Sequence, residues 1–298
     1  MGTKKIKVNY YYPVTKTELQ EIKLINIKPI LEGLKRLDPA ERILQDGEGN
    51  IQLKKINYNN ETNRWELCFL RNKIDAPFIT KLDDEVDSAE SLEEDEFVGQ
   101  ECCMLYDEES KIIALQNNRN SISFNGVSHF LVKYSRKYVQ LSPIIYQERY
   151  CEISDEQEIE YKSVIIGYTD VTKIRELSTM DDDESIRFLA KLTNDISAIN
   201  GKLELNVGRT KNFLGKYKLK KIVDFFKKNK DVTSNLKVKM FDGDTIRLID
   251  LLNNKASDEI QISVTKDDPR TFNKILNALN YVFDQALTTT FEKCKKII

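Results

Sequence analysis

The stretch IQLKKINYNNETNRWELCFLRN, residues 51–72, decides the fold class of this 298-residue chain. Trp65, Leu67 and Phe69 occupy every second position, which is the spacing of a strand with one buried face. The centre of the stretch is rich in asparagine and turns easily. We therefore predict a β-hairpin here, and a sheet of antiparallel strands around it.

Similar patterns recur on both sides of this stretch. A second hairpin is predicted at 97–117, turning at DEES, and a third at 236–249, where Asp242-Gly243 is a favoured two-residue turn. Further strands are predicted at 4–12 (ended by Pro13), 140–147, 160–171, 202–207 and 259–264. Helices are predicted at 26–38, 123–134, 181–196, 217–230 and 268–297, the last with Asp268 as N-cap and Pro269 at its first position.

Strands and helices do not alternate regularly, which favours an α+β fold of mixed or antiparallel β-hairpins with several helices and a long C-terminal helix. We expect two subdomains. The first, 1–155, carries an acidic loop at 83–96; the second, 156–298, carries a basic region at 207–240 and the terminal helix 268–297.

The composition excludes several classes of protein. Hydrophobic residues make up 40% and charged residues 32%, and no run approaches the roughly 20 apolar residues that cross a bilayer. The N-terminus lacks an apolar signal core, so we expect a cytoplasmic protein without membrane insertion. Five irregularly spaced cysteines and a single histidine exclude a disulfide framework and multi-histidine metal sites.

Two catalytic hypotheses arise from the residues. Cys102 and Cys103 could pair with His129, but adjacent residues of a strand point to opposite faces, so this stretch is interpreted as a structural hairpin. Asp242 and Asp244 could join Glu204 and Lys211 in a magnesium-dependent nuclease site, which needs no histidine. The phosphate-loop and dinucleotide fingerprints are missing. We expect no cofactor and no metal, and a protein that is not an enzyme is the favoured interpretation.

Charge is strongly segregated although the net charge is only −2. Residues 83–96 contain nine acidic residues in fourteen, whereas residues 207–240 contain eleven basic residues against Asp224 and Asp231. An ordinary solvated surface mixes both signs, so the basic region is the strongest functional signal in the chain.

A helix at 217–230 is predicted to place the apolar Leu219, Ile222, Val223 and Phe226 on one side. The opposite, outward side is predicted to carry Lys220, Lys221, Lys227 and Lys228. Lys237 and Lys239 share a strand face in the following hairpin, where Arg247 could join them. Such surfaces suit a polyanion, whose phosphates supply affinity without sequence reading. The predicted nucleic-acid-binding residues are Arg209, Lys211, Lys216, Lys218, Lys220, Lys221, Lys227, Lys228, Lys237 and Lys239.

The favoured function is sequence-nonspecific binding of nucleic acid, with double-stranded DNA as the expected ligand. The alternative is a protein–protein regulator or sensor subunit without nucleic-acid affinity, and the magnesium-dependent nuclease comes third. The apolar stripe of the terminal helix, from Phe272 to Phe291, would pack against the core or a dimer partner, and a homodimer is predicted from it.

A resemblance adds a biological setting. The residues Leu105-Tyr106-Asp107, Gln116-Asn117 and Gly126, after an acidic lead-in, resemble a segment of uncharacterised bacterial and prophage proteins. The order of elements resembles that of the phage exclusion protein RexA. This resemblance implies an α+β, dimeric, DNA-binding protein of phage exclusion or phage defence. A phage or host protein is expected as a further partner.

Overall fold

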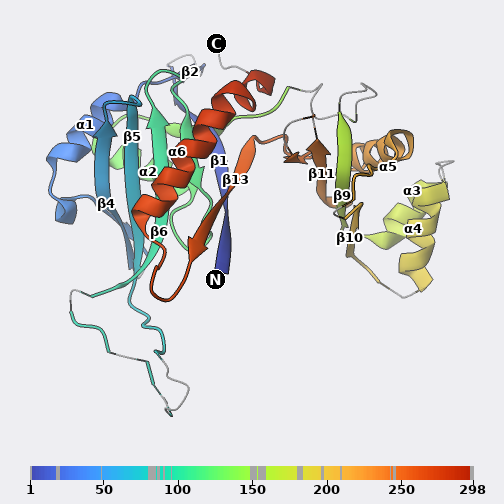
Figure 1. Ribbon diagram of the computed structural model, residues 1–298, viewed down its shortest axis with the longest axis horizontal. Coiled ribbons are helices and arrows are strands. Elements are labelled where there is room, and N and C mark those ends of the chain that lie inside the picture. Colours follow the sequence, from blue (N-terminus) through green and yellow to red (C-terminus); the bar gives the residue numbers. More distant parts are fainter. Residues whose placement is uncertain are drawn as a thin grey trace. The chain divides into compact units, whose positions relative to one another are not determined.

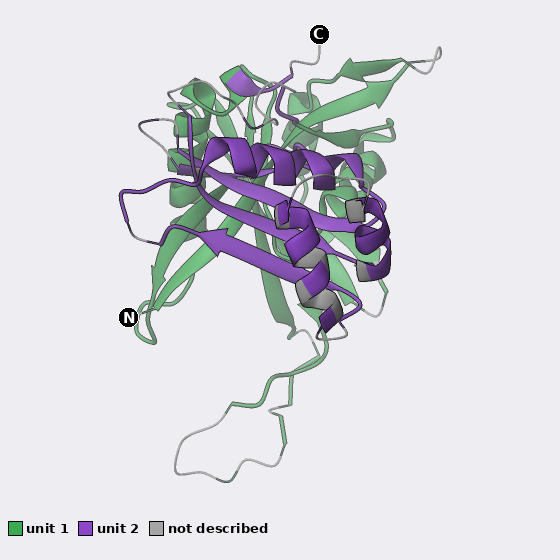
Figure 2. Cartoon of the chain, turned by 90° about the vertical axis from the view of Figure 1, so that its right-hand side faces the viewer, with its two compact units in different colours: residues 1–144, 258–292, 296–298 green, residues 145–257, 293–295 purple. Residues whose placement is uncertain are grey.

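The computed structural model divides the chain into two compact units, which are described separately (Figures 1 and 2). It describes residues 2–295 except 18–20, 48, 80–84, 86–87, 90, 95, 148–152, 154–158, 180–183, 196–197, 209, 242 and 244–245. Unit 1 comprises residues 1–144 and 258–292, and unit 2 comprises residues 145–257 and 293–295.

Unit 1 is built on a nine-stranded sheet with the strand order β13-β1-β7-β6-β5-β4-β3, to which β2 and β8 add by pairing with β1. The strands are β1 (Gly2–Lys16), β2 (Ile22–Leu24), β3 (Ile43–Asp46), β4 (Gly49–Asn59), β5 (Arg64–Lys73), β6 (Val98–Asp107), β7 (Ile113–Gln116), β8 (Gln140–Pro143) and β13 (Ser257–Val264).

The predicted hairpins at 51–72 and 97–117 are confirmed as β4–β5 and β6–β7, and both are antiparallel. The side chains of Trp65, Leu67 and Phe69 are buried in one core cluster, as their spacing predicted. Pro13 does not end the first strand. It lies inside β1 opposite Leu141, and its carbonyl accepts a hydrogen bond from the Ile25 amide beside β2, so its missing N–H faces away from β8 and is not used in the pairing with that strand.

Helices cover both faces of this sheet. On one face, α1 (Lys28–Arg36) and α2 (Phe124–Ser135) bury Leu31, Leu34, Phe130 and Leu131 in the core cluster that contains Phe69. Ser123 caps α2 by accepting a hydrogen bond from the Gly126 amide. A short 3-10 helix, η1 (Pro39–Glu41), follows α1.

The other face is covered by α6 (Phe272–Thr288), which packs against β6 and is followed by the 3-10 helix η3 (Phe291–Lys293) (Figure 1). The predicted bounds 268–297 were too wide. Thr271 caps α6 by accepting from the Lys274 amide, so Asp268 and Pro269 precede the helix. The structure also assigns α6 to unit 1, whereas the predicted division at 155/156 placed it in the second subdomain.

Unit 2 contains a four-stranded antiparallel sheet with the order β10-β9-β11-β12. Its strands are β9 (Glu160–Tyr168), β10 (Gly201–Asn206), β11 (Thr233–Phe241) and β12 (Ile246–Asp250), and its helices are α3 (Val171–Thr179), α4 (Glu184–Asp195) and α5 (Lys216–Lys228). The three helices lie on one side of the sheet (Figures 1 and 2). Together, the two units have the α+β architecture that the irregular order of elements predicted.

The hairpin at 236–249 is confirmed as β11–β12, but its connection is longer than predicted. Phe241 pairs with Ile246, which leaves four residues between the strands instead of the two expected from Asp242-Gly243. Gly243 takes a positive φ of 94°, a conformation open to glycine. Of the helices described, none is both long and apolar enough to cross a membrane.

Candidate nucleic-acid interface

The basic region centres on α5, whose apolar side holds it on the sheet of unit 2. Leu219, Val223 and Phe226 are buried, and the helix packs against β9 and β11. Along β11 the buried residues Leu236 and Val238 recur with a period of two, so they form the sheet face under α5. The predicted amphipathic helix is therefore confirmed, and it begins at Lys216.

The lysines of α5 fall into two groups. Lys218, Lys221 and Lys228 are exposed, whereas Lys216, Lys220 and Lys227 are half-buried at the edge of the apolar side. At about 100° per residue, Lys220 and Lys227 lie within about 60° of Val223, so they flank the buried stripe. The prediction that Lys220, Lys221, Lys227 and Lys228 share one outward face is thus wrong for two of the four.

Some of these lysines form ion pairs or cation–π contacts with neighbouring residues. Lys216 forms an ion pair with Glu160 at 3.6 Å. The ammonium of Lys221 lies 4.8 Å from the ring centroid of Tyr217, an attractive cation–π distance. Within the part of the chain that the structure describes, Lys218 makes no hydrogen bond or ion pair.

The first turn of α5 is unfavourable for the helix itself. A helix N-terminus carries about half a positive charge and is stabilised by acidic side chains. Here the turn contains Lys216 and Lys218 and no acidic residue, and the N-cap Gly215 offers no capping side chain. The sequence therefore concentrates positive charge and unsatisfied backbone N–H groups at one end of α5, an arrangement that attracts anions.

Asp224 is the single acid of α5. It lies three or four residues from Lys220, Lys221, Lys227 and Lys228, which are the spacings of neighbouring side chains on a helix. Its negative charge weakens the positive potential at the middle of the helix. The N-terminal half of α5 is consequently the more strongly positive half.

Lys237 and Lys239 do not join the α5 lysines. Both alternate with Leu236, Val238 and Met240, which are buried under α5, so their side chains lie on the opposite face of the sheet. Lys237 pairs with Asp250 on β12 and with Ile165 on β9, and Ile165 in turn pairs with Glu204 on β10. This face mixes both signs of charge and suits a polyanion less well.

The remaining predicted basic residues are dispersed. Lys211 is exposed in the connection before α5, and Arg209 lies outside the described residues. Arg247 pairs with Met240, so it does not occupy a position beside Lys237 or Lys239. The interface that the structure brings together consists of Lys218, Lys221 and Lys228, with Tyr217 exposed among them; we call this set the α5 surface.

The catalytic hypotheses receive no geometric support. Cys102 and Cys103 are fully buried, and burial raises the thiol pKa of Cys102 while the neighbouring Cys68 raises that of Cys103. His129 is exposed on α2. Asp242 and Asp244 lie outside the described residues, and among those described no cluster of three histidine, cysteine or acidic residues could hold a metal.

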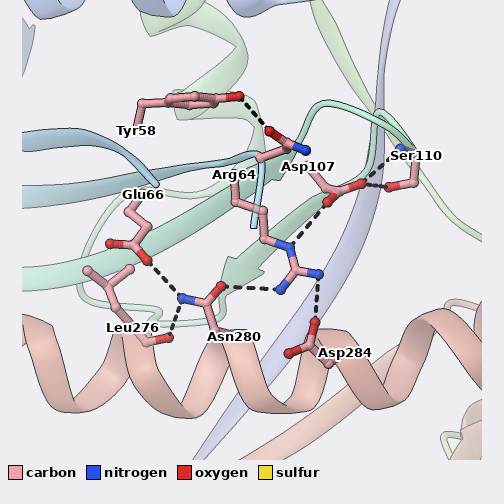
Figure 3. A network of polar contacts seen from close by, with 9 residues as sticks. Tyr58, Arg64, Glu66, Asp107, Ser110, Leu276, Asn280 and Asp284 are labelled. Carbon is pink, nitrogen blue, oxygen red and sulfur yellow. Dashed lines mark hydrogen bonds and ion pairs between the residues drawn. The ribbon is translucent and has the colours of Figure 1, made fainter. Parts of the chain in front are cut away.

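Sequence reasoning missed a buried charge network in unit 1 (Figure 3). The Arg64 guanidinium donates to Asp107 at 3.2 Å and to Asn280 at 3.4 Å, forms an ion pair with Asp284 at 2.6 Å, and lies 4.6 Å from the ring centroid of Phe283. Asn280 also donates to Glu66 at 2.9 Å. The network connects α6 to the start of β5. No local sequence pattern predicts it, because α6 and β5 lie far apart in the sequence.

A family model described as a family of unknown function (DUF6731) matches residues 1–295. No curated protein matches the chain.

Proposed function

The chain belongs to DUF6731, a family whose description assigns no function, so the chemistry of its own surface has to guide the assignment. We propose that the protein binds nucleic acid through the α5 surface, without sequence preference, and that double-stranded DNA is its ligand.

The observation that best supports this proposal is the absence of acidic residues from the first turn of α5. Lys216 and Lys218 stand where a helix prefers acids, and Lys218 is exposed, with no ion pair to a described residue. A placement that costs stability without a structural return is typical of a functional surface. Lys221 and Lys228 extend the positive charge along the exposed side of the helix.

Phosphates are the ligand that this surface suits best. Lysine is a flexible point charge that neutralises phosphate without fixing a base, whereas base reading relies on bidentate side chains such as arginine, asparagine and glutamine. Helix α5 is exposed only through lysines, Asp224 and Tyr217. Such a surface favours affinity from counterion release over recognition of a sequence.

The test measures the anisotropy of labelled duplex DNA, single-stranded DNA and RNA across a salt series. The wild-type protein is compared with a variant carrying Lys218→Glu, Lys221→Glu and Lys228→Glu. We expect duplex binding whose log affinity falls with log salt, and a slope shallower in the variant by roughly one for each phosphate that it no longer neutralises.

A matched control carries Lys202→Glu, Lys237→Glu and Lys239→Glu on the opposite face of the same sheet. Both variants change the net charge equally, so they separate a local surface from a general charge effect. The proposal requires that the control retains wild-type binding. Absence of wild-type binding at low salt, or equal losses in the two variants, would refute it; stronger binding of RNA or single strands would replace the duplex assignment.

The resemblance to phage exclusion and prophage proteins supports a biological setting. We propose that the protein acts in the cytoplasm in phage exclusion or phage defence. Phage should plate less efficiently on cells that express the wild-type protein than on cells that express the α5 variant. Equal plating on both strains would remove this setting without affecting the binding result.

A second function, recognition of a phage or host protein, is favoured by residues 74–79, which follow β5 and lead away from the sheet of unit 1 (Figure 1). Phe78 and Ile79 are about 60% exposed there, beside a strongly acidic sequence. Exposed apolar side chains next to acids suit a basic partner with an apolar groove. Phe78→Ser with Ile79→Ser should abolish such an interaction and leave nucleic-acid binding unchanged.

The apolar stripe of α6 does not support the predicted homodimer. The α6 stripe that suggested it is buried on the sheet of unit 1, since Ile275, Leu279 and Phe283 are inaccessible. A dimer would therefore have to use another surface. Sedimentation of the protein at micromolar concentration decides between one copy and two.

A further inference from the structure

Unit 1 contains an open pocket of about 410 Å³ far along the chain from the α5 surface. Small-molecule sites range from roughly 300 to 1,000 Å³, so the pocket has room for a ligand of nucleotide size. Helix α1 supplies four lining residues and the β4–β5 hairpin two. They are Lys28, Glu32, Lys35, Arg36, Tyr58 and Trp65.

The sequence builds this pocket from two regular elements. The four α1 residues follow the spacing i, i+4, i+7 and i+8, which places them along one stripe of the helix. Leu31 and Leu34 anchor the other side of α1 in the core. Tyr58 and Trp65 are directly opposite each other in the β4–β5 ladder, and their ring centroids lie 5.0 Å apart. A cationic helix stripe thus faces a pair of aromatic rings.

The ammonium groups converge on those rings. Lys28 Nζ lies 5.6 Å from the Tyr58 centroid, and Lys35 Nζ lies 5.9 Å from the Trp65 centroid. Both distances are those of cation–π pairs. The cations therefore line the same space as the aromatic surface, which an ordinary solvated helix face does not achieve.

The residues that line the pocket carry more positive than negative charge. Glu108 accepts hydrogen bonds from Lys28 at 3.0 Å and from the Trp65 indole at 2.8 Å, and the first of these bonds raises the Lys28 pKa. Lys35 and Arg36 form no ion pair with any residue that the structure describes. Glu32 is the only acid that lines the pocket itself. A ligand with an anionic group would complete the arrangement.

We propose that this pocket binds a mononucleotide, with the phosphate on Lys35 and Arg36 and the base against Tyr58. Cations recognise phosphate, and a guanidinium can do so through two parallel hydrogen bonds. The half-buried Tyr58 ring offers a face on which a base can stack, an interaction that every base provides. This site is independent of the proposed DNA interface, because it lies in the other unit and binds a free small molecule.

The structural alternative is that Lys35 and Arg36 only stabilise the end of α1, where cations offset the helix dipole. That role predicts a change in thermal stability when they are replaced, and no ligand. A role in the helix alone does not explain why both residues line a pocket beside the half-buried Tyr58 ring. Binding measurements distinguish the two roles.

Calorimetric titration with adenosine, guanosine, cytidine and uridine monophosphates tests the site, with inorganic phosphate as the comparison. Trp65 is the chain's single tryptophan, so its fluorescence reports occupancy of this pocket directly. We expect saturable binding of at least one nucleotide, a change in Trp65 emission, and affinity for inorganic phosphate lower by about tenfold or more, which corresponds to roughly 1.4 kcal/mol.

Two variants and two controls complete the test. Lys35→Gln with Arg36→Gln, and separately Tyr58→Leu, should each weaken nucleotide binding about tenfold or more. Lys266→Gln, an exposed lysine elsewhere in unit 1, and the triple α5 variant should bind as the wild type does. Absence of saturable binding, equal affinity for phosphate and nucleotide, or unchanged binding in the Lys35/Arg36 variant would each overturn the proposal. None of these outcomes affects the DNA-binding assay.

Discussion

Arg64 is the residue on which the attachment of α6 depends most. Its side chain is only 5% exposed, and it is paired with Asp107, whose side chain is 7% exposed. Breaking a buried ion pair by removing one partner leaves the other charge desolvated, which costs about 3–5 kcal/mol. Arg64→Met should therefore lower the free energy of unfolding of unit 1 by about that amount, measured by urea denaturation.

The exposed Arg119 provides the control, since surface substitutions away from such networks change stability by roughly 0.5 kcal/mol or less. Arg119→Met should therefore unfold as the wild type does. A loss below about 1 kcal/mol for Arg64→Met would show that the exposed Asp284 and the half-buried Asn280, not the buried pair, determine the behaviour of this network.

Tyr106 makes the stability of unit 1 depend on alkaline pH. Burial raises its pKa from 10.0 to about 12. The unfolded chain therefore loses this proton at lower pH than the folded chain, and the unfolded state binds fewer protons between pH 10 and 12. Stability contributed by the neutral phenol is present below pH 10 and declines as pH rises towards 12.

Tyr106→Phe should consequently unfold with a weaker pH dependence than the wild type over this window. Tyr281 is 67% exposed, so Tyr281→Phe should retain the wild-type dependence. Chemical denaturation at a series of alkaline pH values provides the comparison, and identical slopes for wild type and Tyr106→Phe would contradict the assignment.

At the scale of elements, α5 should show opposite effects on stability and on binding. Lys218 is the third residue of the helix, where glutamate complements the dipole and can reach back to the N-cap amide. Lys218→Glu should stabilise unit 2 by about 0.3–1 kcal/mol and weaken duplex DNA binding. Thermal unfolding and anisotropy on the same sample measure both effects.

Lys228→Glu is the matched change at the other end of the same helix, where a cation is favourable. It should weaken binding and also destabilise the helix. If Lys218→Glu destabilised unit 2 as Lys228→Glu does, the lysine at the first turn would have a structural role, and its position would not indicate a functional surface.

Elements were predictable from the sequence wherever one local pattern determined them. The alternation of Trp65, Leu67 and Phe69 located β5, and the apolar spacing along 219–226 located α5. The end of β1 was mispredicted because Pro13 disrupts a strand only where its N–H is needed. The lysines of β11 were wrongly grouped with α5, because which face of a strand a helix covers depends on tertiary packing. The Arg64 network and the α1 pocket join segments distant in sequence, so no local pattern contained them.

At the scale of the whole molecule, each unit has its own hydrophobic core. Phe226 is buried in unit 2 and Phe283 in unit 1, each completely. Truncation of a buried phenylalanine to alanine costs about 3–5 kcal/mol. Calorimetry should show two transitions, of which Phe226→Ala lowers one and Phe283→Ala the other. A single transition that both variants shift equally would show that the units unfold as one.

Unit 2 is inserted between the two sequence segments that form unit 1, and this order affects how unit 1 folds during synthesis. Its sheet begins with β1, yet β13 and α6 come after most of unit 2 in the chain. On the ribosome, unit 2 can acquire all its strands while the N-terminal strands still lack the helix that covers one of their faces. Until α6 has been synthesised, residues that are buried in the finished protein, such as Cys103 and Leu105, would be accessible to chaperones that bind nascent chains. Chains released before α6 emerges should therefore aggregate through unit 1, although the sheet of unit 2 can already have formed.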